Sequence, residues 1–335
     1  MRQIAEKANV SPMTVSRVLR GQPGQASSQT VERILNASRE LSYIPVRAGL
    51  QNKHQETRII SVVFEGSSPD CYFNPLDITL YEGLCRAAAQ HGFDLLNLLR
   101  ADSDWVLDDE ELRYLDRRSD GAIFISSQAG HRQKALEALA SHNIPTVVFG
   151  RRDVPDGVAW IDTNSQSVSH LAVEHLIVKG HRRIAYLSGP DDRYDRQQRR
   201  LAFTTAMQAN GLEEFASAIV PAVKPDFNLD EKVAMNIVSM KATAVICVTD
   251  AAAYQLWELL QQHDLRVPED LSIVGVDNMP ESQWRGLTSV DVSLSLAGQF
   301  ALEAWMALRN GKNFRQCCQL LPTKFIERNS VLSLW

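Results

Sequence analysis

The chain has 335 residues and a mass of 37.5 kDa, which is enough for about two domains with packed cores. Its 44% hydrophobic and 22% charged residues exclude a disordered or collagen-like chain, and its five cysteines show neither a disulfide framework nor a zinc-site spacing. The net charge of −5 is unevenly distributed. Residues 1–57 carry eight basic and four acidic residues, whereas the remainder carries 27 basic and 36 acidic ones, so a head of +4 precedes a body of −9.

The start of the chain shows no charged segment followed by an apolar stretch, and no apolar run approaches the roughly 18 residues of a membrane span. Together with the cysteine pattern, this predicts a protein of the reducing cytoplasm that has no membrane partner.

The head has the pattern of three short helices. Apolar residues recur at helical spacing over 2–8, and Ser11 and Pro12 are typical of a cap and a first turn, so a second helix follows them. A third helix is expected over about 27–41. Because the first two helices are joined by a tight turn, the pattern predicts a helix-turn-helix.

The second helix carries the residues that suit a DNA groove. Its apolar side chains share one face, which leaves Met13, Thr14, Ser16, Arg17 and Arg20 on the exposed side. Arg17 can donate two hydrogen bonds to a guanine, although a phosphate contact or a solvated arginine is an equal alternative. Met13 can touch a thymine methyl group or be incidental, and Pro12 contributes shape only.

The stretches IAEKANVSPMTVSRVL, SSQTVERIL and LSYIP resemble the head of the lactose/galactose repressor family of bacterial transcription regulators. This resemblance implies that Ser11, Thr14, Ser16 and Arg17 contact double-stranded operator DNA. It also implies a homodimer on a near-palindromic site.

The head departs from the family pattern in two places. The first helix starts at Arg2 without a Ser or Thr cap, which predicts a loss of about 1 kcal/mol. Asn52 stands where the family has the leucine that wedges into the minor groove, so Leu50 is the candidate wedge in a shifted register.

The body alternates short apolar runs with helical stretches, which predicts doubly wound α/β lobes with parallel sheets. Strands are expected at 59–64, 93–99, 121–126, 146–150, 183–189, 242–250 and 271–277. Helices are expected at 76–91, 132–142, 167–179, 199–210 and 251–263.

Later segments, among them SDGAIFI, EHLIVKGHRRIAYLSGP and VPEDLSIVGVDN, extend the family resemblance along the chain. They imply a periplasmic-binding-protein-like core of two lobes with an effector in the cleft and no cofactor. The expected organisation is a head at 1–45, a hinge at 46–57 and a core at 58–335. The N-lobe takes about 58–161 and 290–320, the C-lobe about 162–289 and 321–335, and the crossings lie near 160–163, 288–292 and 320–323.

Ligands of such sheets bind beyond the carboxyl ends of the strands, where polar residues are therefore candidates. Arg200 lies in the slot of the family's effector-clamping arginine and can grip hydroxyls together with Asp277, unless the two form an internal ion pair. Phe227 can stack on the ligand or pack in the core, and Asp250 is expected to cap the next helix. The full candidate set is Asn74, Asp77, Ser127, Arg151, Arg200, Phe227, Thr249 and Asp277.

Two of these candidates have a simpler interpretation. Ser and Thr residues at strand ends are often helix caps, and Ser127 and Thr249 are in such positions. Four arginines between residues 193 and 200 favour an acidic or phosphorylated sugar, or else belong to a solvated helix start. The effector is expected to be a sugar or sugar derivative, with a non-sugar effector such as a nucleobase as the alternative.

The sequence disfavours two other protein classes. A sugar-binding protein without DNA-binding activity would share the body but would have no use for the head. An enzyme is disfavoured because the sequence contains no nucleophile elbow, P-loop, GxGxxG after the first body strand or HExxH pair.

Overall fold

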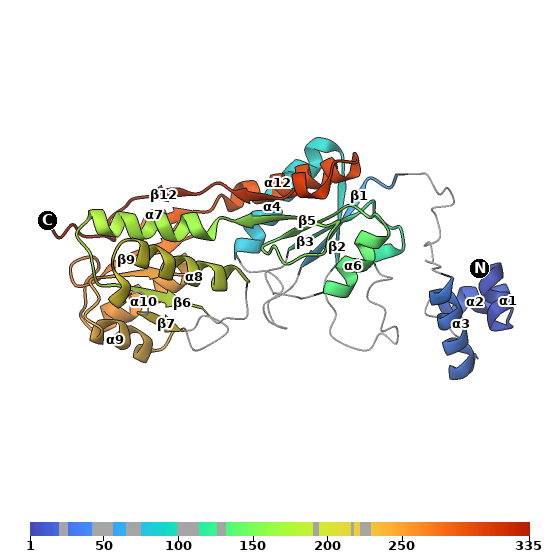
Figure 1. Cartoon of the computed structure of the whole chain (residues 1–335), viewed down its shortest axis with the longest axis horizontal. Coiled ribbons are helices and arrows are strands. Elements are labelled where there is room, and N and C mark those ends of the chain that lie inside the picture. Colours follow the sequence, from blue (N-terminus) through green and yellow to red (C-terminus); the bar gives the residue numbers. More distant parts are fainter. Residues whose placement is uncertain are drawn as a thin grey trace.

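The structure, a computed structural model, describes residues 1–19, 26–41, 56–64, 75–98, 114–125, 132–189, 194–215, 218–221 and 229–335. It contains a helical head and two α/β lobes (Figure 1). The doubly wound architecture that the sequence predicts is confirmed. No helix among the described residues is long and apolar enough to cross a membrane.

Three helices form the head: α1 (Arg2–Ala8), α2 (Pro12–Leu19) and α3 (Ser28–Glu40). Their apolar faces enclose a small core, whose buried members are Ile4, Ala5, Ala8, Val15, Val18, Ile34 and Ala37. Met1 occupies the N-cap of α1 and makes no side-chain hydrogen bond there. Leu41 was expected to extend the stripe of α3, but it lies beyond the helix and is 38% exposed.

The first lobe is built on a six-stranded sheet in the order β11-β5-β4-β3-β1-β2, and its described pairs are parallel. Its elements are β1 (Ile59–Phe64), α4 (Pro75–His91), β2 (Asp94–Leu98), β3 (Ala122–Ile125), α6 (Gln133–Ser141), β4 (Thr146–Phe149), β5 (Ala159–Thr163), α12 (Leu294–Arg309), the 3₁₀ turn η2 (Phe314–Gln316) and β11 (Gln319–Leu321).

The second lobe carries a sheet in the order β12-β10-β9-β8-β6-β7. The pair β10·β12 is antiparallel, and the other described pairs are parallel. Its elements are α7 (Ser165–Val178), β6 (Ile184–Ser188), α8 (Tyr194–Ala209), the 3₁₀ turn η1 (Glu213–Phe215), β7 (Ile219–Pro221), α9 (Glu231–Ser239), β8 (Ala244–Cys247), α10 (Asp250–Gln262), β9 (Ser272–Val276), α11 (Pro280–Arg285), β10 (Thr288–Asp291) and β12 (Lys324–Ile326).

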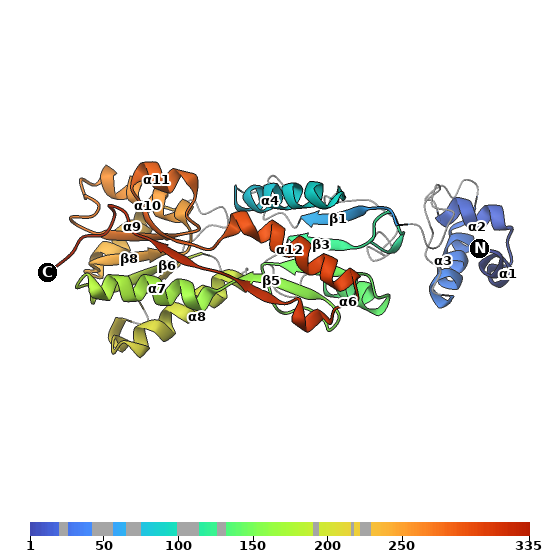
Figure 2. The same ribbon diagram turned by 90° about the horizontal axis from the view of Figure 1, so that it is seen from above.

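The two lobes are interwoven, since consecutive elements belong to different lobes at three places in the described chain. The chain leaves the first sheet after β5, returns from β10 into α12, and passes from β11 to β12 (Figure 2). Two of these segments also touch each other, because Ser167 Oγ lies 2.6 Å from Thr323 Oγ1. A shift of one lobe against the other must therefore bend all three segments together.

Each strand expected from the sequence is present; the strand at 59–64 has the expected ends, and the ends of the others differ by at most three residues. The helix expected from residue 199 instead starts at Tyr194, because its charged first turns hide the helical pattern. Four cysteines lie in the described residues, and all four are free thiols.

Candidate functional site

Helix α2 presents a polar surface above an apolar underside. Val15 and Val18 are buried against the other two helices, whereas Met13 is 65% exposed and Arg17 is exposed beside it. Because one face of the helix is held by the core, its rotation about its own axis is fixed. The exposed face can therefore enter a groove with a defined set of side chains.

The start of α2 is stabilised by a local hydrogen bond. Ser11 Oγ accepts from the backbone N–H of Thr14 at 3.1 Å, as expected of the cap, and lies 2.9 Å from Thr14 Oγ1. Pro12 takes the first helical position, where a missing N–H costs nothing. Ser11, Pro12, Met13, Thr14, Ser16 and Arg17 thus lie within two helical turns.

A second polar site lies at the carboxyl ends of the second lobe's strands. Arg199 of α8 and Asp277, directly after β9, are both buried, with Arg199 Nη2 3.7 Å from Asp277 Oδ1. Arg199 Nη1 also donates to the carbonyl of Val248 at the end of β8, at 2.7 Å. The guanidinium group therefore connects the ends of two neighbouring strands.

The backbone that carries Asp277 is unusual. Asp277 has φ +107° and Asn278 has φ +53°, values that side-chain-bearing residues seldom adopt. The N–H of Asp277 donates to Val290 O at 2.9 Å, and that of Asn278 to Ser289 Oγ at 3.1 Å. These bonds hold the turn, so the direction of the Asp277 carboxylate is set by its neighbours.

Asp250 accepts hydrogen bonds from residues around the same turn. Its fully buried carboxylate accepts from the N–H of Met279 at 2.8 Å, from Ser282 Oγ at 2.5 Å and from Ser289 Oγ at 2.7 Å. Burial raises the pKa of Asp250 to about 6, although these three donors act in the opposite direction. The sequence-based assignment of Asp250 as a helix cap is therefore wrong. Thr249 is the N-cap of α10 and accepts from the N–H of Ala252 at 3.2 Å.

The first lobe contributes a charged pair near the start of α8. Arg152 Nε donates to Asp162 Oδ2 at 2.7 Å, and the Arg152 guanidinium lies 5.5 Å from the centre of the Trp160 ring. Burial raises the pKa of Asp162, and the charge of Asp195 on α8 raises it further. Residues of both lobes thus interact here. Burial raises the pKa of Tyr194, and the charges of Arg152 and Asp162 also act on it. We call Arg152, Asp162, Tyr194, Asp195, Arg199 and Asp277 the interlobe polar cluster.

Three buried hydroxyl groups at this end of the lobes make no hydrogen bond within the described part of the chain. They are Thr163 Oγ1 at the end of β5, Ser165 Oγ at the start of α7, and the phenol of Tyr186 on β6. Burial raises the pKa of Tyr186, and Arg199, Asp195 and Arg200 all act on it electrostatically. The Tyr186 hydroxyl therefore belongs to the same neighbourhood as the interlobe polar cluster.

The arginines of α8 differ in burial and in their partners. Arg199, not Arg200, makes the ion pair with Asp277, and Arg200 is only half-buried. The inward face of α8 carries Arg196, Arg199 and Phe203 at intervals of three and four, whereas the effector contact of Arg200 stays a prediction. Since Arg196 and Arg199 are buried, this segment is not a simple solvated helix start.

Two further predicted residues lie in the first lobe. Arg151 is buried, and its Nη1 donates to the backbone carbonyl of Asp153 at 2.9 Å and lies 3.2 Å from the Asp153 carboxylate. Asp77 is half-buried in the first turn of α4. Five predicted residues lie outside the described residues, namely Arg20 and Leu50 of the DNA-binding set and Asn74, Ser127 and Phe227 of the effector set.

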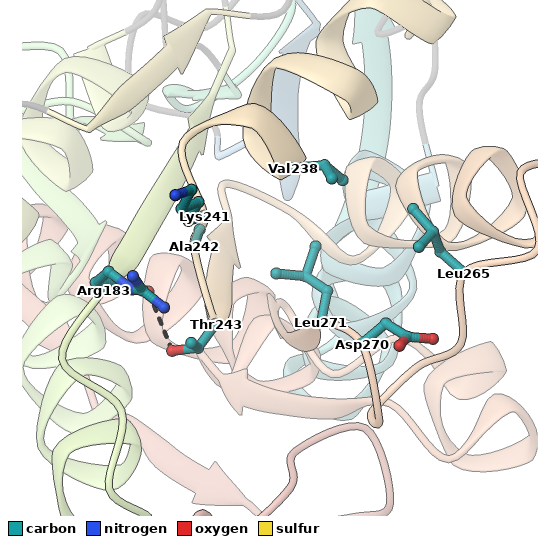
Figure 3. Close-up of a pocket in the computed structure, with 8 residues that line it drawn as sticks. All are labelled: Arg183, Val238, Lys241, Ala242, Thr243, Leu265, Asp270 and Leu271. Carbon is teal, nitrogen blue, oxygen red and sulfur yellow. Dashed lines mark hydrogen bonds between the residues drawn. The ribbon is translucent and has the colours of Figure 1, made fainter.

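A cavity of about 320 Å³ opens at the opposite end of the second lobe (Figure 3). Arg183, Thr243 and Leu271 line it and directly precede β6, β8 and β9, so it lies at the amino ends of the strands that carry the interlobe polar cluster at their other ends. None of the predicted site residues lines it. Within the described residues, no group of His, Cys, Asp and Glu side chains could hold a metal ion.

Comparison with known proteins finds relatives of both the head and the core. Residues 1–46 match the model for bacterial regulatory proteins of the lacI family, and residues 173–331 match a periplasmic binding protein-like domain. A transcriptional repressor, PurR of Photobacterium profundum, is 26% identical over 100% of this chain and 99% of its own length. This chain therefore has a lacI-family regulatory head domain and a periplasmic binding protein-like domain, and the relatives it matches include transcriptional repressors.

Solved structures of the family share the fold over almost the whole chain. A complex of the regulator CelR with cellobiose has a TM-score of 0.68 at 24% identity and covers 98% of both chains. A lac repressor dimer bound to operator and the anti-inducer ONPF has a TM-score of 0.66 at 24% identity, with the same coverage. In family terms, α1 to α3 form the regulatory head, and β1 to β12 belong to the two lobes of the effector domain.

Sequence reasoning missed four residues of the interlobe polar cluster, Arg152, Asp162, Tyr194 and Asp195, and it did not single out Arg199. Asp162 lies inside β5, where an acidic residue interrupts an otherwise apolar strand. A buried carboxylate needs a partner, so that interruption was the available signal. Nothing in the sequence identifies the partner as Arg152, ten residues earlier in a loop.

Proposed function

We propose that this repressor binds a near-palindromic operator as a homodimer and that a sugar or sugar derivative, bound at the interlobe polar cluster, controls it. The head of residues 1–45 binds DNA, residues 46–57 form the hinge, and residues 58–335 form the core. The N-lobe comprises about 58–161 and 290–320, and the C-lobe 162–289 and 321–335. The chain acts as a regulator and not as an enzyme.

The buried pair of Arg199 and Asp277 is the observation that carries the effector assignment. A guanidinium group on α8 and a carboxylate after β9, 3.7 Å apart, offer donors and acceptors that can hold neighbouring hydroxyl groups by charge-assisted hydrogen bonds. The three buried hydroxyls of Thr163, Ser165 and Tyr186 supply further partners for a polyhydroxylated ligand. A relative in complex with cellobiose supports the same class.

The DNA assignment is supported by the exposed face of α2. Met13, Arg17 and the polar residues Ser11, Thr14 and Ser16 surround the start of a helix whose rotation is fixed by its buried face. Pro12 adds shape there, and we propose Arg20 as a further DNA contact. We propose Leu50 as the wedge that kinks the operator. The lac repressor dimer bound to operator supports a two-fold symmetric complex.

A ligand that binds the folded protein raises its thermal midpoint, so a ligand screen tests the effector class. The full-length protein is heated with a panel of sugars, phosphorylated sugars, nucleosides and nucleobases. We expect sugars or phosphorylated sugars to raise the midpoint, and Asp277→Ala to abolish that rise. Asp156→Ala, which removes an exposed acid paired only with Arg315, is the control and keeps it.

Stabilisation by nucleobases or nucleosides alone would replace the sugar assignment. A sugar that still stabilises Asp277→Ala would contradict the proposed site. Gel shifts on operators selected from random duplexes test the other half of the proposal. Two protein chains should bind each full operator.

A further inference from the structure

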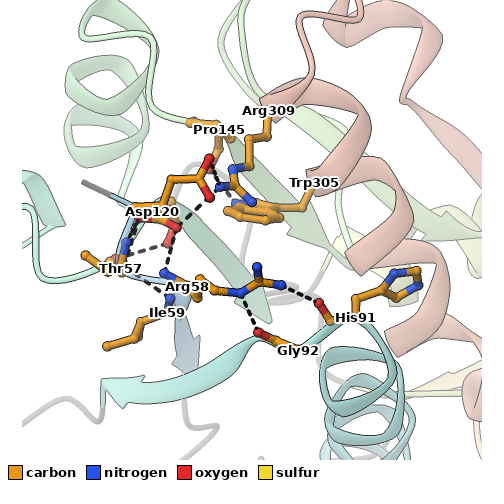
Figure 4. Close-up of polar contacts among 12 residues, drawn as sticks. Thr57, Arg58, Ile59, His91, Gly92, Asp120, Pro145, Trp305 and Arg309 are labelled. Atoms are coloured by element: carbon orange, nitrogen blue, oxygen red, sulfur yellow. Dashed lines mark hydrogen bonds and ion pairs between the residues drawn. The ribbon is translucent and has the colours of Figure 1, made fainter. Parts of the chain in front are cut away.

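Residues 56–58, where the chain enters the core from the head, are fastened to the first lobe (Figure 4). Asp120 accepts from the N–H and the Oγ1 of Thr57, both at 2.8 Å, and from the N–H of Arg58 at 3.0 Å. Arg309, at the end of α12, adds a bridge, because its Nη2 lies 2.7 Å from Glu56 Oε1 and 3.7 Å from Asp120 Oδ2.

Arg58 fastens the same segment to the end of α4. Its Nε donates to Gly92 O and its Nη2 to His91 O, both at 2.9 Å, so it satisfies carbonyls that a helix end leaves without internal partners. The guanidinium group lies 5.3 Å from the centre of the Phe93 ring, and that of Arg309 lies 5.2 Å from it. We call Asp120, Arg309 and the side chain of Arg58 the linker anchor.

The two helices that end at the linker anchor are packed unusually closely. A Cβ on Gly298 of α12 would lie 2.1 Å from the backbone N of Leu84, and one on Gly83 of α4 would lie 2.7 Å from the carbonyl oxygen of Ser295. Figure 2 shows α4 and α12 side by side over the first sheet. Because neither backbone can retreat from the other, the pair behaves as one rigid body.

The other end of α12 adjoins the effector side of the molecule. The helix follows Asp291, whose carboxylate accepts from Asn278 Nδ2 at 3.2 Å, and Asn278 is the neighbour of Asp277. One rigid helix pair therefore runs from the turn that carries Asp277 to the point where the head's linker enters the core.

We propose that the linker anchor positions the DNA-binding heads of the dimer for simultaneous contact with both halves of an operator. The proposal rests on the proposed function, because it requires a dimeric complex. Only 14 residues separate the last described residue of the head, Leu41, from Glu56. A fixed entry point restricts where each head can lie before DNA binds. Without the anchor, residues 56–58 of both chains must become ordered when the operator binds. The entropy lost in this ordering weakens operator binding.

The linker anchor is a positioning device more than a stabilising one. Arg58 is exposed, so water can replace the hydrogen bonds that an Arg58 variant loses. The Asp120 side chain is only 12% exposed, so the thermal midpoint of each Asp120 variant is measured beside its operator affinity. An effect on operator binding is thus separable from an effect on folding.

Fluorescence anisotropy with the full-length protein tests the proposal. The probes are a full operator, selected from random duplexes by the wild-type protein, and a duplex with one half-site. We expect Asp120→Ala to weaken binding to the full operator by about five-fold or more and to change half-site affinity by less than about two-fold. Asp120→Asn, which keeps one acceptor oxygen, should lose less.

Asp156→Ala is the matched control, since it makes the same change in charge at an exposed site and should bind both probes as the wild type does. Arg58→Met keeps the stem over Phe93, removes the two bonds to α4, and should repeat the selective loss without touching Asp120. Thermal midpoints within about 2 °C of the wild type exclude a folding defect as the cause.

Full-operator affinity unchanged in both Asp120→Ala and Arg58→Met would overturn the role of the linker anchor. An equal loss on the half-site would do so as well, because it would show a damaged head or core. If the wild type itself does not prefer the full operator, the proposed dimeric binding fails and the anchor's role fails with it.

Discussion

Arg199 on α8 and Asp277 after β9 form an ion pair in the interior of the second lobe, with their nearest charged atoms 3.7 Å apart. Both side chains are almost fully buried, and the pair lies where a ligand of such a sheet is expected. Burying two charges is unfavourable unless each has partners, so the pair indicates a functional requirement more than a stabilising one.

The first prediction concerns the energy of this pair. Replacing Asp277 by Ala leaves a buried guanidinium group without its counter-charge, and should lower the free energy of unfolding by about 3 kcal/mol. Arg199→Met should lower the free energy of unfolding by a similar amount. The loss in the double variant should be clearly smaller than the sum of the losses in the two single variants. Urea unfolding of the four proteins measures the coupling. Strictly additive losses would show that the two charges do not interact.

The second prediction concerns base reading by Arg17. If Arg17 donates two hydrogen bonds to a guanine, Arg17→Ala should remove about 1–3 kcal/mol of discrimination at that base pair in each half-site. Competition between the selected operator and versions changed at single base pairs measures this. Arg33→Ala, a loss of equal charge on α3, is the control. A uniform weakening on all sequences, with a smaller salt dependence, would instead identify Arg17 as a phosphate contact.

The third prediction concerns pH. The pKa of Asp250 is about 6 in the folded chain and starts from 3.8 as the ordinary value, so between these pH values the folded state binds more protons than the unfolded state. Its contribution to stability is therefore full below pH 4 and falls as the pH rises to 6, by about 3 kcal/mol in all.

Asp250→Asn cannot titrate and should lack this contribution. The measurement is urea unfolding at pH 4 to 7, with the wild type compared with the variant at each pH so that other carboxyl groups cancel. A difference between the two proteins that stays constant with pH would contradict the raised pKa.

The fourth prediction concerns the α4–α12 contact. Gly298→Ala places a methyl group 2.1 Å from backbone nitrogen and 2.4 Å from the Leu80 carbonyl oxygen, which no side-chain rotation relieves. Stability should fall by about 3 kcal/mol. Gly311→Ala is the comparison, because its methyl group meets open space and only its φ of +83° opposes the change, at a cost of about 1 kcal/mol. Similar losses in the two variants would argue against close packing of the helices.

Much of the architecture can be predicted from local patterns. The strands of the body are short apolar runs bounded by turns, and the helices of the head carry apolar residues at helical spacing, so both follow from periodicity alone. The cap at Ser11 was predictable for the same reason, since a cap bonds to residues only two or three positions away.

The candidate site was predictable only in part. Asp277 was found because it ends a recognisable strand, but its ion pair with Arg199 was not predicted. Helical rotation separates Arg199 from Arg200 by about 100°, so that the first turns inward and the second lies at the edge. The rotation depends on where α8 begins and on what Phe203 packs against, and neither is a local property.

The sequence by itself determined the order of helices and strands, the polar face of α2 and the family resemblance of this protein, because these depend on residues close together in the chain. The tertiary structure decided which charges meet. Arg199 meets Asp277, Asp250 meets Ser289, and Thr57 meets Asp120 across separations of tens of residues. Such pairs form because a buried or half-buried polar group must find a partner in three dimensions, and only the packing of the lobes determines which partner is within reach.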